Sequence, residues 1–204
     1  MSEAILHGIV LAFGLIIPLG VQNVFVFNQG ASQSTLFKAA PVVITAATCD
    51  TILILFAVQG VSLMLLTFSW LTTILYTIGF FFLLYMGWAI WKSEPTVSKN
   101  EVQTMTIKKQ IIFAASVSLL NPHAILDTIG VIGTNSIQYI GAEKWAFTFA
   151  TIFVSWIWFI GLAIAGRILG KVDSSGTKIK LLNKISGVII WGVAFYMLAK
   201  LFIK

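Results

Sequence analysis

The chain has 204 residues, of which 58% are hydrophobic and 10% are charged, and its mean hydropathy is +0.97. A soluble domain of this length does not need so much apolar surface, so the composition indicates a polytopic membrane protein. The net charge of +6 is no sign of nucleic-acid binding, because the basic residues fall between apolar runs. A single cysteine, Cys49, excludes an internal disulfide and a multi-cysteine metal cluster.

Six apolar runs approach or exceed the length of about 20 residues that a helix needs to cross a bilayer. We expect all six to be helices, which makes the fold class all-α. The segments between them are too short to form soluble domains, so residues 1–204 are predicted to form a single transmembrane domain. The predicted spans are 4–27, 41–66, 71–91, 110–132, 145–166 and 185–203.

Basic residues concentrate in the first, third and fifth predicted loops. The positive-inside rule places these loops in the cytoplasm and therefore both chain termini outside the cell. Lys144 and the two lysines of the C-terminal tail are the basic residues on the opposite side. The basic residues of the three loops are Lys38, Lys92, Lys99, Lys108, Lys109, Arg167, Lys171, Lys178, Lys180 and Lys184.

The fourth span contains a helix breaker at its middle. Pro122 has no backbone N–H to donate to the carbonyl of Ser118, and it biases Asn121 away from helical angles. Because Asn is a good N-cap and Pro a good first helical residue, we predict that the helix breaks at Asn121 and restarts at Pro122. The N-terminal end of the restarted helix suits an anion, whereas Asp127 suits a cation. A site for both charges is typical of a zwitterion such as an amino acid.

The two halves of the chain have a similar pattern. Pro18 lies near the middle of the first span and is followed five residues later by Asn23, as Pro122 is followed by Asp127. Three spans in each half give the halves opposite orientations, so we expect two inverted repeats, at about 1–100 and about 105–204. Broken first and fourth helices in corresponding positions are typical of a transport site.

Several polar side chains lie inside the predicted spans. Asp50 and Asp127 are costly in lipid, and neither span has a Lys or Arg to neutralise them, so each is expected to face a cavity, a cationic substrate or an exchangeable proton. The alternative is a structural carboxylate that is protonated or hydrogen-bonded between helices. Gln22 and Asn23 either bond neighbouring helices or contact substrate. His123 follows the break and is either a proton-relay residue or a packing residue.

Three segments resemble the LysE superfamily. Pro18-Leu-Gly-Val-Gln-Asn-Val-Phe-Val-Phe-Asn-Gln-Gly30 is similar to the first-helix motif of its lysine/arginine exporters, and Asn121-Pro-His-Ala-Ile-Leu-Asp-Thr128 to their second motif. Cys49-Asp-Thr-Ile-Leu53 resembles the family's aspartate segment in the second helix. The homoserine/threonine branch usually has Pro-Gly-Pro and Asn-Pro-Lys at the first two places. Val21 stands where the family commonly has a second proline.

The resemblance implies a transporter and not an enzyme, with no cofactor and no bound metal. It implies export of lysine or arginine from the cell, driven by the proton-motive force, by a multi-pass protein of the bacterial plasma membrane. The substrate and coupling residues would then be Asp50 and Asp127, together with the residues at the two breaks. Those residues are Pro18, Gln22, Asn23, Asn121, Pro122 and His123.

Other functions remain open at this point. The cargo could instead be a neutral amino acid, as in the threonine/homoserine type, or a metal cation at the two carboxylates. An intramembrane aspartyl protease would use Asp50 and Asp127 as an acid/base pair, although the expected Gly-x-Gly-Asp signature is absent around Asp127. The sequence leaves the oligomeric state open, and a homodimer is compatible with it.

Overall fold

Every regular element that the structure, a computed structural model, describes is a helix, as predicted. The described residues are 1–17, 20–61, 69–92, 105–173 and 176–202, and all structural statements below concern them. The predicted site residue Pro18 lies outside this part of the chain. The elements are α1 (Ser2–Ile16), α2 (Val21–Ser32), α3 (Leu36–Phe56), the π-helical turn η1 (Ala57–Val61), α5 (Ser69–Trp91), α6 (Ile107–Leu119), α7 (Pro122–Asp127), the π-helical turn η2 (Thr128–Gly133), α8 (Thr134–Ser136), α9 (Gly141–Val172) and α10 (Thr177–Phe202).

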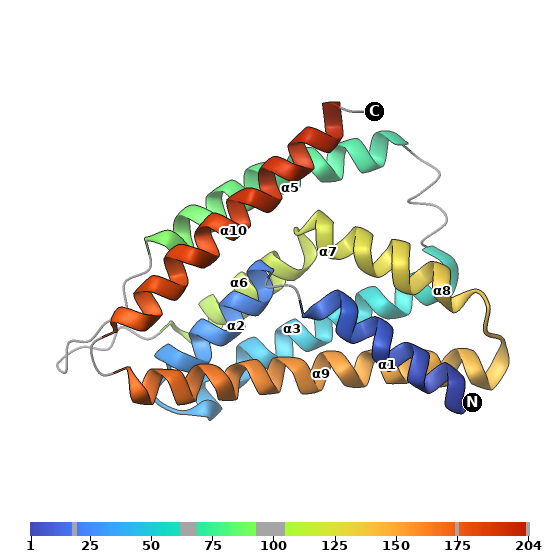
Figure 1. Cartoon of the computed structure of the whole chain (residues 1–204), viewed down its shortest axis with the longest axis horizontal. Coiled ribbons are helices and arrows are strands. Elements are labelled where there is room, and N and C mark those ends of the chain that lie inside the picture. The colour runs from blue at the N-terminus through green and yellow to red at the C-terminus, as the bar shows by residue number, and fades with distance from the viewer. Residues whose placement is uncertain (18–19, 62–68, 93–104, 174–175, 203–204) are drawn as a thin grey trace.

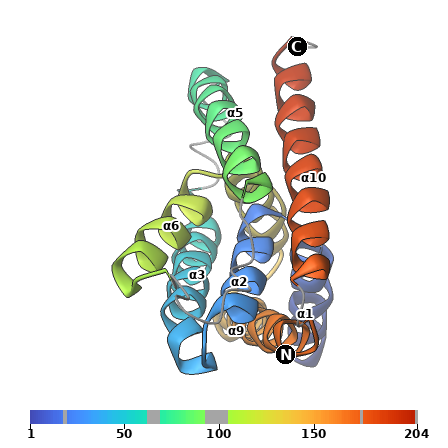
Figure 2. The ribbon, with the colours of Figure 1, turned by 90° about the vertical axis from the view of Figure 1, so that its left-hand side faces the viewer.

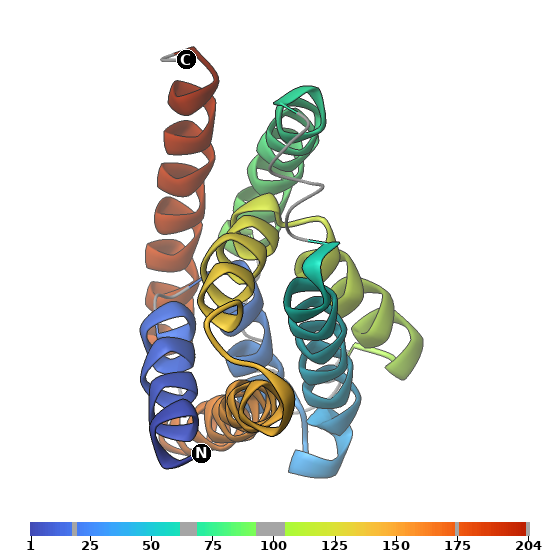
Figure 3. The same cartoon turned by 90° about the vertical axis from the view of Figure 1, so that its right-hand side faces the viewer.

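The helices run roughly along one axis in alternating directions (Figure 1). α1 begins at the right-hand end of that view and α2 ends at the left, whereas α6 begins at the left and α8 leads back to the right. The long helices α3 and α9 also run in opposite directions and pack against each other. The α5–α10 pair extends away from the remaining helices when the molecule is viewed from either end (Figure 2 and Figure 3).

Three helical stretches of the described chain are long and apolar enough to cross a membrane, or four if the bent pair α1–α2 counts as one span. The three are 36–60, 141–172 and 177–196. Large apolar side chains on their outer surfaces, such as Phe149 and Phe153 on α9, are exposed. Surfaces of this kind are stable against lipid, which supports a multi-pass membrane protein.

Both predicted helix breaks lie near the middle of the molecule. α6 ends at Leu119 and α7 begins at Pro122, so the predicted break at Asn121 is confirmed. α1 and α2 are bent by 80° relative to each other around the break that precedes Val21. The predicted fourth span is therefore a series of short pieces, α6, α7, η2 and α8, rather than one helix.

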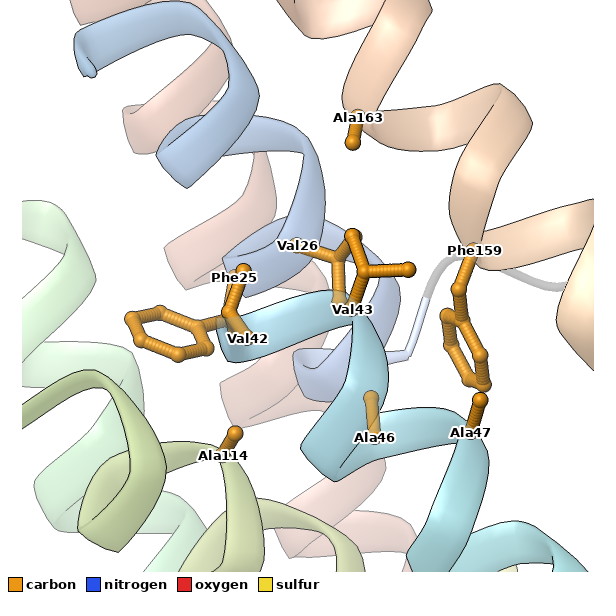
Figure 4. Close-up of a cluster of buried hydrophobic side chains, with 9 residues drawn as sticks. All are labelled: Phe25, Val26, Val42, Val43, Ala46, Ala47, Ala114, Phe159 and Ala163. Carbon is orange, nitrogen blue, oxygen red and sulfur yellow. The ribbon is translucent and has the colours of Figure 1, made fainter. Parts of the chain in front are cut away.

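The core joins the two halves of the chain through small and β-branched residues. Between α2, α3, α6 and α9, Phe25 and Val42 face Ala114, while Phe159 lies beside Ala47 (Figure 4). Small residues also let α2 and α9 approach closely, because a Cβ at Gly166 would overlap the backbone carbonyl of Phe27. This contact fixes the half-helix α2 against a long helix from the other half of the chain.

Candidate substrate site at the helix breaks

A cavity of about 240 Å³ lies where the two helix breaks meet α3 and α9. Its lining includes five of the predicted site residues, from α2, α3, the α6–α7 break and α7. Its volume is at the small end for ligand pockets, which suits a metabolite of a few heavy atoms rather than a peptide. The five predicted residues are Gln22, Asn23, Asp50, Asn121 and Asp127.

The structure does not describe the side chains of the other three predicted site residues. Pro122 and His123 are the first two residues of α7, but their side chains lie outside the described structure. Pro18 precedes the described residue Gly20, which lines the cavity and stands at the N-cap position of α2. The roles predicted for Pro18, Pro122 and His123 therefore stay predictions.

Asp50 is held between the two halves of the chain. Its Oδ1 accepts a hydrogen bond of 3.1 Å from Gln22 Nε2 on α2, and its Oδ2 accepts one of 3.2 Å from Ser155 Oγ on α9. Both donors are neutral, so the carboxylate is oriented but its charge is not compensated by them. This is the geometry of a fixed anionic group with capacity to accept further hydrogen bonds.

The side chain of Asn121 does not act as a cap, contrary to its predicted role. Asn121 occupies the N-cap position of α7, yet its side chain accepts no hydrogen bond from the helix. Asn121 is only 7% exposed, and its buried Oδ1 has no hydrogen-bond partner among the described residues. A buried acceptor without a donor is costly, and a ligand in the cavity that Asn121 lines would supply one.

Asn23 has an internal role as well as a place at the cavity wall. Its Nδ2 donates to the backbone carbonyl of Ile16 at 2.7 Å, and its Oδ1 accepts from Trp158 Nε1 at 3.3 Å. The broken helix leaves carbonyls at the end of α1 without helical donors, and Asn23 supplies one of the missing bonds. Of the two alternatives for Asn23, the hydrogen bonds favour the one that joins helices.

The ionisable residues that the structure describes in the cavity lining are all acidic. Two of its lining residues are carboxylic acids, Asp50 and Asp127, and no Lys, Arg or His is among the described residues that line it. Most of the remaining lining is apolar, which lowers the local dielectric constant and strengthens attraction to a cation. No group of three or more His, Cys, Asp and Glu in the described structure is arranged to hold a metal ion.

Sequence reasoning missed the hydroxyl groups of α9. Thr151 and Ser155 line the cavity, and Thr128 adds a third hydroxyl from η2. The spacing of the halves could have indicated Ser155, because the contact partners Asp50 and Ser155 are separated by 105 residues, close to the separation of the two prolines.

Comparisons with known proteins identify the family of the chain. A family model described as LysE type translocator matches residues 13–201. A Bacillus subtilis (strain 168) protein named "Putative amino-acid transporter YisU" is 58% identical over 200 residues, covering 98% of this chain and 91% of that protein. The Arginine exporter protein ArgO of Klebsiella pneumoniae (strain 342) is 32% identical over 195 residues, covering 94% of this chain and 91% of ArgO. ArgO of Salmonella typhi is 32% identical over 196 residues, with the same coverage.

No solved structure matches the chain significantly. The family match covers nearly the whole chain, including both helix breaks and every lining residue of the cavity except Ala12. It rules out the intramembrane protease alternative, since the relatives are transporters. The chain belongs to the LysE type translocator family and is a transmembrane transporter, not an enzyme.

Proposed function

We propose that this transporter exports basic amino acids, lysine and arginine in particular, across the plasma membrane of a bacterium. The observation that carries the proposal is the small cavity lined by two carboxylic acids and by no described Lys, Arg or His. Such a cavity is complementary to a solute with a cationic side chain. The relatives named arginine exporters support the same cargo.

The cationic head of the substrate would lie between Asp50 and Asp127. Asp50 is already oriented by Gln22 and Ser155, so little conformational entropy is lost when a guanidinium or ammonium group binds it. The unpartnered Oδ1 of Asn121 would accept a further hydrogen bond from the same head. These acceptors together match the several N–H donors of arginine and lysine.

The sequence favoured the start of the restarted helix, the six-residue α7, as the site for the α-carboxylate of the substrate; we place this group instead at the first turn of α2. Gly20, Val21 and Gln22 line the cavity, and no side chain caps the N-terminus of this twelve-residue helix. The free backbone N–H groups and the positive end of the helix dipole suit an anion. The zwitterionic end and the cationic end of one amino acid would thus contact different walls of the cavity.

Export would be driven by the proton-motive force. Moving a +1 solute out of the cell against an inside-negative potential costs about 2.3 kcal/mol per 100 mV. An inward-moving proton offsets that charge, and a carboxylate that holds either the proton or the substrate would couple the two movements. Asp127 and Asp50 are the cavity groups that can do so.

The transporter would consist of two inverted repeats of three spans each. Supporting this, α1–α2 and α6–α8 run in opposite directions and each contains a central break. The contacts are also reciprocal, since α1 and α2 pack on α9 while α6 and η2 pack on α3. Rocking of one repeat against the other would expose the cavity to each side in turn.

The termini would lie outside the cell. The start of α3, the start of α6 and the end of α9 lie at the end of the molecule opposite the N-terminus (Figure 1). These helix ends carry the basic residues Lys38, Lys108, Lys109, Arg167 and Lys171. The positive-inside rule assigns that end to the cytoplasm.

Counterflow in proteoliposomes tests the cargo. Vesicles preloaded with unlabelled lysine are expected to accumulate labelled arginine, with competition from lysine but not from leucine, threonine or Cd²⁺. Competition by threonine and not by lysine would assign the protein to the neutral type instead.

An imposed pH gradient tests the coupling. It is expected to drive uphill arginine movement by the wild-type protein but not by Asp127→Asn. Undiminished coupling in Asp127→Asn would refute the role of this aspartate in proton coupling.

A further inference from the structure

Polar contacts close the described structure at both of its ends, beyond the cavity. At the end that carries the N-terminus, His7 Nδ1 on α1 lies 2.8 Å from Tyr139 Oη, and Gln138 Nε2 lies 3.4 Å from the same nitrogen. The amino group of Met1 forms an ion pair of 2.6 Å with Glu143 at the start of α9. We call these contacts the terminus-side latch.

A second set of contacts lies at the opposite end. Gln33, just after α2, and Gln110, in the first turn of α6, both donate to the backbone carbonyl of Met105, at 3.2 and 3.0 Å. Arg167 on α9 donates to the backbone carbonyls of Gln33 and Ser34. Gln33 and Gln110 are 2% and 1% exposed, so both side chains are buried. We call these contacts the loop-side latch.

The two latches join corresponding parts of the chain. On the terminus side, the first half-helix of the first repeat is bonded to the segment after the second half-helix of the second repeat. On the loop side, the segment after the second half-helix of the first repeat is bonded to the segment where the second repeat begins. Each latch therefore crosses between repeats at one end of a broken helix pair.

An apolar layer lies between each latch and the cavity. On the loop side it includes Phe25 and Phe113, whose ring centroids are 4.1 Å apart. On the terminus side, Ile54 and Ile132 line the cavity and pack with Phe147, whose ring centroid lies 5.5 Å from that of His7. A cation cannot cross such a layer at low cost, so movement of substrate requires each layer to separate in turn.

We propose that the two latches are the gates of the transport cycle, one for each side of the membrane. The inference rests on the proposed alternating exposure of the cavity, and it assigns the closing contacts to His7–Tyr139 and to Gln33–Met105–Gln110. Both latches are formed in this structure. Breaking one latch opens the cavity only at the end that this latch closes. It therefore shifts the population of transporters toward the conformation that is open at that end.

Thiol labelling from each side tests the gates directly. The single cysteine is removed as Cys49→Ala, and Ala12→Cys, at a residue that lines the cavity, reports exposure to a membrane-impermeant maleimide. Right-side-out and inside-out vesicles expose opposite ends of the protein. Tyr139→Phe removes the terminus-side hydroxyl, and Gln33→Leu removes the amide that crosses to Met105 on the loop side.

Tyr139→Phe is expected to raise the labelling rate from the terminus side and to lower it from the loop side. The rise should be roughly three- to tenfold, because that is the population shift that the loss of one hydrogen bond produces. Gln33→Leu is expected to do the reverse. Tyr85→Phe makes the same chemical change on the exposed surface of α5 and is expected to change neither rate. Equal changes at both ends, or no change in either latch variant, would overturn the proposal.

The labelling result is independent of the cargo. Opposite shifts in the two variants, without counterflow of any basic amino acid, would leave the gates in place and refute the proposed substrate. Counterflow of arginine without the opposite shifts would support the proposed substrate and overturn the proposed gates.

Discussion

Replacing Asp50 with asparagine separates the charge of this group from its structural contacts. The new Oδ1 can accept the hydrogen bond from Gln22, and the new amide can donate to the hydroxyl oxygen of Ser155. The two side chains have nearly the same volume, so the packing between α3 and α9 is retained. Asp50→Asn should therefore fold and insert normally while the cavity loses one of its two carboxylates.

The expected loss of affinity follows from the contact with the cationic head. A hydrogen bond to a charged group contributes about 2–3 kcal/mol, which corresponds to a rise of about 30- to 150-fold in the half-saturating concentration of arginine. Because Asp127 remains in the cavity, binding is weakened rather than abolished. The assay is arginine counterflow in proteoliposomes over a range of external concentrations.

Asp173→Asn is the matched control for Asp50→Asn. Asp173 lies at the end of α9, outside the cavity, where its Oδ2 accepts from the backbone N–H of Ile179 at 2.9 Å. The same chemical change there should leave the half-saturating concentration of arginine unchanged. A half-saturating concentration in Asp50→Asn within about threefold of wild type would refute the assigned charge contact.

Two further predictions concern the scaffold around the cavity. Asn23→Ala leaves the Ile16 carbonyl without its donor and is expected to destabilise the protein by about 1–3 kcal/mol, read as a lower thermal midpoint in detergent; an unchanged midpoint would contradict this account of the first break. Gly166→Ala places a methyl group against the Phe27 carbonyl and is expected to cost about 1–3 kcal/mol, whereas Gly161→Ala, which meets no atom within 4 Å, is expected to be neutral. Equal midpoints for the two glycine variants would show that α2 and α9 do not depend on this close approach.

The helix break and the polar lining were predictable because both depend on local chemistry. Pro122 prevents a regular helix through residue 121 wherever the segment lies, and Asp50 or Asp127 is costly in lipid whatever surrounds it. Asn121, by contrast, was expected to cap α7, and its side chain does not, since side-chain direction depends on the cavity around it. The sequence identifies which residues are unusual more reliably than it identifies their partners.

The partners could not be predicted because they arise from helix crossings. Ser155 meets Asp50 only because α3 and α9 cross at that level, and Trp158 reaches Asn23 from the same helix. His7 on α1 likewise contacts Tyr139 across 132 residues. Contacts of this range follow from the packing of whole repeats and leave no mark in local sequence patterns.

The most direct test of the central claim compares arginine with citrulline as competitors in counterflow. Citrulline has nearly the same shape as arginine, but a neutral urea group replaces the guanidinium. If the two carboxylic acids of the cavity recognise a cation, unlabelled arginine and lysine should suppress the exchange of labelled arginine. Citrulline should need about a hundredfold higher concentration for the same suppression, roughly the factor that one charged contact provides. Suppression by citrulline at the same concentration as arginine would contradict the claim, because the cavity would then recognise the shape of the amino acid and not its charge.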